Sequence, residues 1–498
     1  MSDTTAITTE PAQRTWLPFA LISAIFLAVK LVVFLGMSPI GDEAYYWLWG
    51  QHLDWSYFDH PPLHAWAMAA IKAILGWNLW SLRALTLLTF GGTLLIFWDW
   101  ARRLQPDAPA EYFWRATTIY LAAPLFLGMS SIVFNDHLMM FLVVASGHAM
   151  LIFAEGVESN RPRYRWLYLS ALLLGLAVLT KYNAVFLGLG YAIFLIVRRP
   201  LRPLYRNPHT YLAGLLSIAI QTPMLWWNYT QNFASFGFHT AGRWSSTPHF
   251  AWYNPLLFLL VATIVVSPFV CVAVWRYWSR KPVEGFEARA KALAMSTFAI
   301  SSLALLALAS VAEVFFYWNI VAFILLIPLL PLVMRNVWLM GLHVAYGLGM
   351  AALLLVNQFY APIGNLTGSY DWTIASTYGW SEIGREVEAA RTEHKAAFVG
   401  TTFYTTAAQL GFAIKDPNTV AISTRPDQFD VWFKPELHRG ETAIIVADST
   451  WPIDYAAGMF ERVTPLETLE ISSFGRVIYA PTIYLMENFT PPGAENWK

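Results

Sequence analysis

The sequence predicts an α-helical membrane protein that crosses the bilayer about eleven times and ends in a soluble α/β domain. Apolar residues make up 57% of the 498 residues and charged residues only 13%, whereas about a quarter of an ordinary globular chain is charged. Mean hydropathy is +0.45. Apolar stretches close to the roughly 20 residues needed to span the hydrocarbon core recur throughout residues 1–356.

The composition also excludes several classes of protein. So few charges cannot cover the surface of a soluble protein of this size, and disorder, a coiled coil and a collagen-like rod are excluded too. The 32 basic and 32 acidic residues give a net charge of zero, so no basic field points to a nucleic-acid partner. The single cysteine, Cys271, excludes an intramolecular disulfide framework.

Most of the apolar stretches are predicted to be single spans. They cover residues 17–36, 82–100, 116–134, 137–154, 209–226, 251–274, 292–311, 319–334 and 337–356. The first is not a cleavable signal peptide, because no small-residue cleavage site follows it.

Residues 167–197 are ambiguous, because this long apolar stretch is interrupted only around Lys181. Arginines flank it at 161–165 and 198–206. Loops rich in Lys and Arg stay in the cytoplasm, so the stretch between them must cross an even number of times. We therefore expect two short helices that meet near Lys181, below the outer membrane surface and beside a wet cavity.

Residues 357–498 contain no further span and are predicted to form a periplasmic α/β domain after a membrane domain of residues 1–356. Periodicity predicts a helix at 379–394. Short apolar runs predict buried strands at 396–400, 419–423 and 443–446.

Carboxylates and cations gather at span ends on the predicted outer side. Asp42 and Asp59 lie in the first outer loop, Asp136 follows the third span, and Lys181 and Arg243 fall on the same side. Ionisable groups at membrane depth are costly and usually functional. A carboxylate can act as general base on a hydroxyl and cations can stabilise a phosphate leaving group, so we expect group transfer from a lipid phosphate to an alcohol or amine.

Structural roles remain open for the same residues. Asp42 and Asp136 suit helix N-caps, and Asp59 suits a cap region with prolines in the first turn. Lys181 suits snorkelling to the interface. Arg243 suits an ordinary loop position.

Two further patterns have alternative interpretations. His60 and His64 are four residues apart and suit metal ligands on one helix face, although no third ligand is evident. The Tyr and Trp residues at 45–49 favour an interfacial anchor over a substrate platform.

Several short motifs together resemble the protein O-mannosyltransferase superfamily. They are Gly41-Asp42-Glu43-Ala44-Tyr45-Tyr46, Phe58-Asp59-His60-Pro61-Pro62-Leu63, Asn135-Asp136 and Leu179-Thr180-Lys181-Tyr182. This is the bacterial branch of the GT-C glycosyltransferases, which includes the lipid A aminoarabinose transferases and the rhizobial galacturonosyltransferases. The order of the motifs carries the resemblance, and the C-terminal domain fits it.

The resemblance implies a multi-pass enzyme of the bacterial inner membrane, with its site on the periplasmic face. It implies inverting transfer of a sugar from a polyprenyl-phosphate donor to lipid A, core or another glycan or lipid acceptor. No cofactor is required and no metal ligand is assigned, although a divalent cation is compatible with the reaction.

The resemblance also implies roles for single residues. Asp42 resembles the essential aspartate of the first loop, which acts as base or orients the acceptor, and Asp136 resembles the second essential acid. Asp59 occupies the acidic position before the Pro-Pro pair. His60 replaces a lysine that is often found there and is thought to contact phosphate. Lys181 carries charge on the right side to bind phosphate.

Arg243 is a second candidate for binding phosphate, on the same argument of charge and sidedness. Glu43, Tyr45 and Tyr182 neighbour the motif residues and are expected to contact substrate.

Two other functions stay open. A protein O-glycosyltransferase acting on Ser or Thr is compatible with the resemblance. A flippase or transporter for a lipid-linked sugar would also use intramembrane charges, but the sequence shows no inverted repeat.

Overall fold

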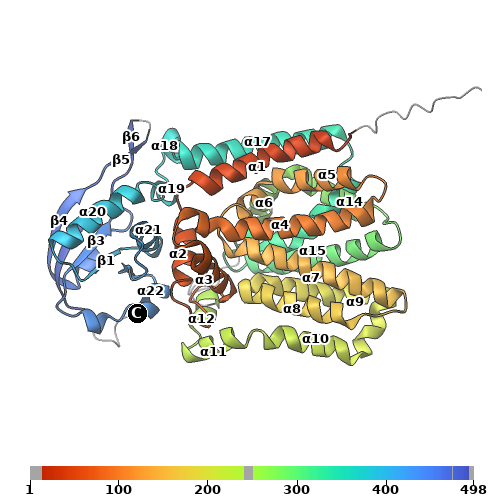
Figure 1. The fold of residues 1–498 in the computed structure, drawn as a ribbon, viewed down its shortest axis with the longest axis horizontal. Helices are drawn as coiled ribbons and strands as arrows, with labels where there is room; N and C mark the ends of the chain where they lie inside the picture. Colours follow the sequence, from red (N-terminus) through yellow and green to blue (C-terminus); the bar gives the residue numbers. More distant parts are fainter. Residues whose placement is uncertain (1–13, 241–250, 474, 493–498) are drawn as a thin grey trace, which may run out of the picture.

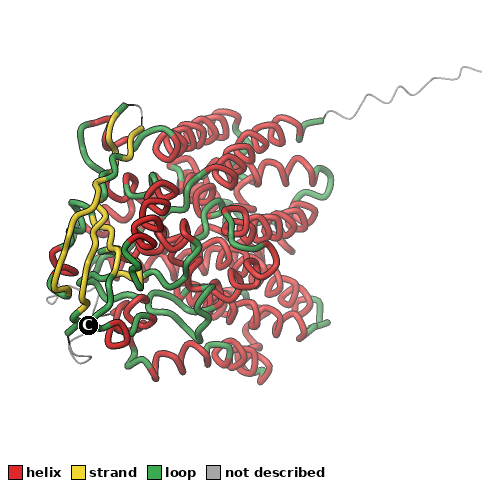
Figure 2. Tube along the Cα trace, turned by 60° about the vertical axis from the view of Figure 1, so that its left-hand side comes forward, coloured by secondary structure: helices red, strands yellow, loops and turns green. Residues whose placement is uncertain are grey.

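The computed structural model describes residues 14–240, 251–473 and 475–492. A helical bundle forms one part of the molecule, and a small sheet with its own helices forms the other (Figure 1). The strands gather on one side, next to the end of the bundle, in both views (Figures 1 and 2). The structure is therefore mostly helical with a C-terminal sheet region, as the sequence predicts.

Five helices in the described ranges are long and apolar enough to cross a membrane. They are α1 (Leu17–Gly36), α4 (Leu79–Leu104), α7 (Asn135–Glu158), α15 (Phe286–Ala309) and α17 (Val337–Phe359). Each overlaps a predicted span. The last helix ends just beyond the predicted domain boundary at residue 356.

Other predicted spans are broken. The 116–134 stretch is divided between α5 (Pro109–Ala122) and α6 (Pro124–Met129), and the 209–226 stretch between α10 (Pro208–Ala219) and α11 (Thr222–Thr230). The 251–274 stretch becomes α13 (Asn254–Val266) and α14 (Pro268–Ser279), which meet at 99°. Each second helix has a proline in its first turn, where the missing N–H costs nothing.

The predicted span at 319–334 is not one helix. It forms the short α16 (Ile320–Ile324) and the 3-10 helix η4 (Ile327–Leu332), both buried inside the bundle. Pro331 lies within η4, and proline cannot continue an α-helix. Counting each bent pair as one span gives up to seven spans by length and composition among the described residues, so the count of about eleven is not confirmed.

The predicted break at Lys181 is confirmed. The helix α8 (Tyr164–Thr180) ends there, a 3-10 turn η1 (Tyr182–Ala184) follows, and α9 (Val185–Val197) continues the chain. α9 then bends by 113° into η2 (Arg199–Arg206).

Two helices fill the loop after α1, close to where the N-cap alternatives for Asp42 and Asp59 would start helices. They are α2 (Gly41–Trp49) and α3 (Leu63–Leu75). α2 packs against α21 (Tyr404–Ile414) of the C-terminal region. A Cβ atom at Gly41 would lie 2.3 Å from the Thr405 Cβ atom, so this close approach requires glycine.

The C-terminal sheet has five strands in the order β2-β1-β3-β7-β4. The parallel part contains β1 (Phe398–Thr401), β2 (Val420–Ala421) and β3 (Ala443–Ala447), with Val399 opposite Ile444. The antiparallel part adds β7 (Thr482–Phe489) and β4 (Phe460–Thr468), and a separate ribbon pairs β5 (Ile471–Ser473) with β6 (Arg476–Tyr479). The helix predicted at 379–394 is α20 (Trp380–Glu393), and the three predicted strands are present.

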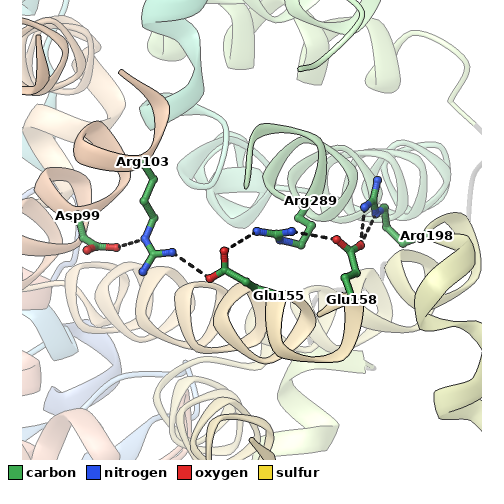
Figure 3. A network of polar contacts seen from close by, with 6 residues as sticks. All are labelled: Asp99, Arg103, Glu155, Glu158, Arg198 and Arg289. Atoms are coloured by element: carbon green, nitrogen blue, oxygen red, sulfur yellow. Dashed lines mark hydrogen bonds and ion pairs between the residues drawn. The ribbon is translucent and has the colours of Figure 1, made fainter. Parts of the chain in front are cut away.

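An ionic network joins helices at the end of the bundle away from the sheet (Figure 3). At its centre, the Arg289 guanidinium lies 2.9 Å from a carboxylate oxygen of Glu155 and 2.9 Å from one of Glu158. Arg103 of α4 pairs with Glu155 and with Asp99, and Arg198 pairs with Glu158. The network therefore ties α4, α15 and the junction between α9 and η2 to α7.

We expect Arg289→Gln to destabilise the protein by about 2–3 kcal/mol, because two carboxylates on α7 lose their shared cation. Arg103→Gln should cost less than about 1 kcal/mol, because this side chain is 31% exposed whereas that of Arg289 is 6% exposed. Thermal unfolding of the full-length protein in detergent measures both. Equal shifts in the melting temperature would contradict the assignment of Arg289 as the centre of the network.

Candidate functional site

A cavity of about 430 Å³ lies between the helical bundle and the C-terminal domain. Its walls come from α2, the loop before α3, the turn between α8 and α9, residues 315–318 and α21. It brings together six of the predicted site residues, which are Asp42, Tyr45, Asp59, His60, Lys181 and Tyr182. Segments that are far apart in the sequence thus form one site.

The orientation of α2 depends on Glu43. Its Oε2 atom accepts from the backbone N–H of Ile40 at 3.2 Å, which closes the first turn of the helix. Arg83 of α4 donates to both carboxylate oxygens, at 3.0 and 2.6 Å, and the Val133 N–H donates to Oε1 at 2.9 Å. Glu43 is fully buried and does not line the cavity, so the expectation that it contacts substrate is corrected to a structural role.

Asp42 lies on the neighbouring position of α2 and points into the cavity. The Tyr404 hydroxyl of α21 donates to its Oδ1 atom at 3.2 Å. The interpretation of Asp42 as an N-cap is wrong, because Ile40 is the N-cap of α2. Burial, and then the nearby carboxylate of Asp59, raise the pKa of Asp42 to about 6.

Asp59 is held by groups from both parts of the molecule. Tyr45 donates to its Oδ2 atom at 2.9 Å, and Arg425 donates to its Oδ1 atom at 3.2 Å. The Arg425 guanidinium lies 4.1 Å from the centroid of the Tyr404 ring. Asp59 and Asp42 are thus both connected to the C-terminal domain.

Lys181 and Asp136 form a buried ion pair. The Lys181 Nζ atom lies 2.6 Å from Asp136 Oδ2, and the two residues are 4% and 1% exposed. The interpretation that Lys181 snorkels to the membrane interface is therefore wrong. The interpretation of Asp136 as an N-cap is also wrong, because Phe134 is the N-cap of α7. The Lys181 side chain lines the cavity, and its Nζ atom lies 4.6 Å from the Tyr317 ring centroid. Asp136 does not line the cavity but pairs with Lys181.

The aromatic stripe at 45–49 is not an interfacial anchor. Trp47 and Trp49 are fully buried, and Tyr45 packs edge-on against Tyr404 with ring centroids 4.9 Å apart. α21 covers this stripe, a contact that the local pattern does not reveal. Tyr45 therefore contributes to the cavity wall.

His60 and His64 have different surroundings. His60 lines the cavity, near the ring of Tyr46 at 5.8 Å, whereas His64 turns toward His137 with their Nε2 atoms 3.2 Å apart. A shared metal site on one helix face is therefore wrong. Within the described ranges, no group of three or more His, Cys, Asp or Glu side chains is placed to hold a metal ion.

The remaining predicted residues have different outcomes. Tyr182 lines the cavity, and its hydroxyl lies 3.0 Å from the Ser235 hydroxyl of α12 (Ala234–Thr240). Arg243 lies outside the described residues.

Comparisons with known proteins agree with this architecture. Residues 59–227 match the family model described as dolichyl-phosphate-mannose-protein mannosyltransferase. The chain is 26% identical over 382 residues to the lipid A galacturonosyltransferase RgtD of Rhizobium johnstonii, covering 75% of this chain and 77% of that protein. The predicted resemblance to the protein O-mannosyltransferase superfamily is confirmed.

Solved structures show the same fold. Crystal structures of ArnT from Cupriavidus metallidurans superpose with TM-scores of 0.60 in the apo state and 0.62 when bound to undecaprenyl phosphate. Both matches cover 95% of this chain and 98% of ArnT, at 15% and 16% identity. The chain therefore shares the fold of ArnT and is similar in sequence to the lipid A galacturonosyltransferase RgtD.

Sequence reasoning missed several residues of this cavity. Tyr404 lines the cavity and Arg425 pairs with Asp59, yet both belong to the C-terminal domain. His239 of α12 also lines the cavity and contacts the backbone oxygen of Asp59 at 2.7 Å. No local motif distinguishes these residues, since only tertiary contacts bring them to the site.

We expect Lys181→Met to destabilise the protein by about 3–5 kcal/mol, because the Asp136 carboxylate stays buried without its cation. Combining Lys181→Met with Asp136→Leu should restore most of the lost stability. Melting temperatures of the full-length protein in detergent give the comparison, with exposed Lys72→Met as a control. A double variant less stable than Lys181→Met would show that the pair is not coupled.

Proposed function

We propose that the chain transfers a sugar from a polyprenyl-phosphate donor to lipid A or a related glycan or lipid acceptor, on the periplasmic face of the bacterial inner membrane. The observation that carries this proposal is a carboxylate with a raised pKa, Asp42, in the same cavity as the cation Lys181. The relative RgtD is named as a lipid A galacturonosyltransferase, and ArnT binds undecaprenyl phosphate in its crystal structure.

The donor phosphate is proposed to bind at Lys181. An ammonium has three N–H donors, so Lys181 can hold Asp136 and a phosphate oxygen at the same time. The lipid tail then lies between helices, in the hydrocarbon region. His60, at the same wall of the cavity, adds a second group that can donate to the phosphate.

Asp42 is proposed to act as the general base. It removes the proton from an acceptor hydroxyl, whose oxygen forms a bond to the anomeric carbon on the face opposite the phosphate. The bond between the anomeric carbon and the phosphate oxygen breaks, and its electron pair leaves with the polyprenyl phosphate. This single displacement inverts the anomeric configuration.

The electrostatics of the site agree with these separate roles for Asp42 and Lys181. A base works best when its pKa is close to the working pH, and burial brings Asp42 toward that range. Asp59 is neutralised by Arg425 and oriented by Tyr45, so it is proposed to position the acceptor. The negative charge that develops on the leaving phosphate is stabilised by Lys181.

A transfer assay in proteoliposomes tests the proposal against the alternatives. With a radiolabelled undecaprenyl-phosphate sugar and lipid A, transfer releases free undecaprenyl phosphate and labels lipid A. A sugar lipid that only changes leaflet would indicate a flippase, and a labelled Ser or Thr peptide would indicate a protein O-glycosyltransferase. Repeating the assay with a chelator tests whether the reaction proceeds without a divalent cation.

Asp42→Asn should lower the rate of transfer by about 10²–10⁴-fold, because the amide cannot accept the acceptor proton. Binding of undecaprenyl phosphate and thermal stability should change little. The control is Asp107→Asn, an exposed carboxylate outside the cavity. Full activity of Asp42→Asn would reject Asp42 as the base.

The pH profile should follow the ionisation of Asp42. A base must be deprotonated, so kcat/KM should fall about tenfold for each pH unit below about pH 6 and level off above it. Tyr404→Phe removes a hydrogen bond that lowers this pKa, so the acidic limb should move to higher pH. Tyr455→Phe, outside the cavity, is the control. A limb that moves to lower pH in Tyr404→Phe would contradict the assignment.

A further inference from the structure

A second cavity, of about 700 Å³, lies between the first outer loop and the C-terminal sheet. The loop between α2 and α3, the end of α20, the beginning of β1, the turn before β2 and the α22 helix (Gln428–Trp432) line it. It has no lining residue in common with the first cavity. The mechanism proposed above leaves this cavity without a role.

The walls of the second cavity combine aromatic rings with polar side chains. Phe429, Trp432 and Phe433 provide apolar faces. Arg391 and Asp416 provide charged donors and acceptors. Sugar rings need this combination, because their C–H faces pack on aromatic rings while their hydroxyl groups form hydrogen bonds.

The charges on the wall argue against a lipid chain as the ligand. Asp54, Asp416, Arg391 and Lys434 line the cavity, and charged groups beside an acyl or prenyl chain would be desolvated without compensation. The hydroxyl groups of a carbohydrate can form hydrogen bonds with these side chains.

The cavity walls are held in place before any ligand binds. His52 stacks on Trp432 with ring centroids 4.5 Å apart, and its Nε2 atom lies 2.8 Å from the Pro417 carbonyl oxygen. Arg391 and Asp416 form an ion pair at 3.0 Å. Preformed walls reduce the entropy lost on binding.

The two cavities share a structural wall. Phe429 of the second cavity stacks on Tyr45 of the first, with ring centroids 5.8 Å apart. The loop that carries Asp59 also carries His52, and the Tyr57 hydroxyl fixes that loop by donating to the backbone oxygens of Trp49 and His52. The walls of the two cavities are therefore joined through this ring pair and this loop.

We propose that the second cavity binds the carbohydrate headgroup of the acceptor, while one hydroxyl of the same molecule reaches Asp42 in the first cavity. This inference rests on the proposed function and adds the part of the site that selects the acceptor. In this arrangement the C-terminal domain recognises the acceptor, and the helical bundle binds the donor.

The test fills the second cavity from its exposed rim. Ala397→Trp and Asn418→Trp each place an indole in the cavity, at positions whose side chains are exposed. Thr392→Trp, on an exposed position of α20 that does not line the cavity, is the matched control. Full-length protein in nanodiscs is probed with deacylated lipid A by saturation-transfer NMR, and with intact lipid A and an undecaprenyl-phosphate sugar in the transfer assay.

We expect both filled variants to lose most of the saturation transfer to deacylated lipid A and to raise the KM for lipid A about tenfold or more. The KM for the donor should stay the same, and Thr392→Trp should match the wild type. Undecaprenyl phosphate binding and a monodisperse elution profile show that each variant is folded.

The two proposals fail in different ways. A wild type that transfers sugar to lipid A, with both filled variants unchanged in KM and saturation transfer, overturns the acceptor cavity alone. A wild type that transfers no sugar overturns the proposed function, and loss of saturation transfer in the filled variants would still support a carbohydrate site.

Discussion

The buried ion pair between Glu43 and Arg83 is the constraint on which the site depends. Both side chains are fully buried, and Arg83 also donates to the carbonyl oxygens of Val33 and Met37 at the end of α1. The Glu43 carboxylate also accepts a hydrogen bond from the backbone N–H of Val133, just before α7. One pair therefore fixes α1, α2, α4 and the start of α7 relative to one another. Breaking such a pair leaves a buried charge uncompensated, so its geometry is strongly maintained.

The position of Asp42 follows from this constraint. Adjacent residues of a helix point about 100° apart, so Asp42 faces a different direction from Glu43. There α21 of the C-terminal domain supplies Tyr404. The C-terminal domain is thus part of the site and does not merely cover it, since Arg425 also pairs with Asp59. Charges that would be costly in isolation are arranged in pairs, and Lys181 with Asp136 follows the same rule.

The charged groups that line the cavity lie in two different environments. The cation is buried at the break between two short helices, where a non-helical turn can line a cavity within the bundle. The carboxylates lie where the bundle meets the C-terminal domain, and burial of Asp42 makes it a better base at neutral pH. The far end of the bundle carries a different kind of charge cluster, the Arg289 network, which joins helices and whose residues do not line the cavity.

The sequence by itself determined the helical membrane class, the break at Lys181 and the C-terminal α/β pattern, because hydropathy, charge asymmetry and period are local properties of the chain. It also determined that Asp42, Asp59 and Lys181 are candidates for one site. Only the tertiary structure decided that Glu43 is structural and that Tyr404 and Arg425 bind the carboxylates of Asp42 and Asp59. Neighbouring residues on a helix face different directions, and contacts between residues far apart in the sequence leave no local pattern, so tertiary packing had to decide these roles.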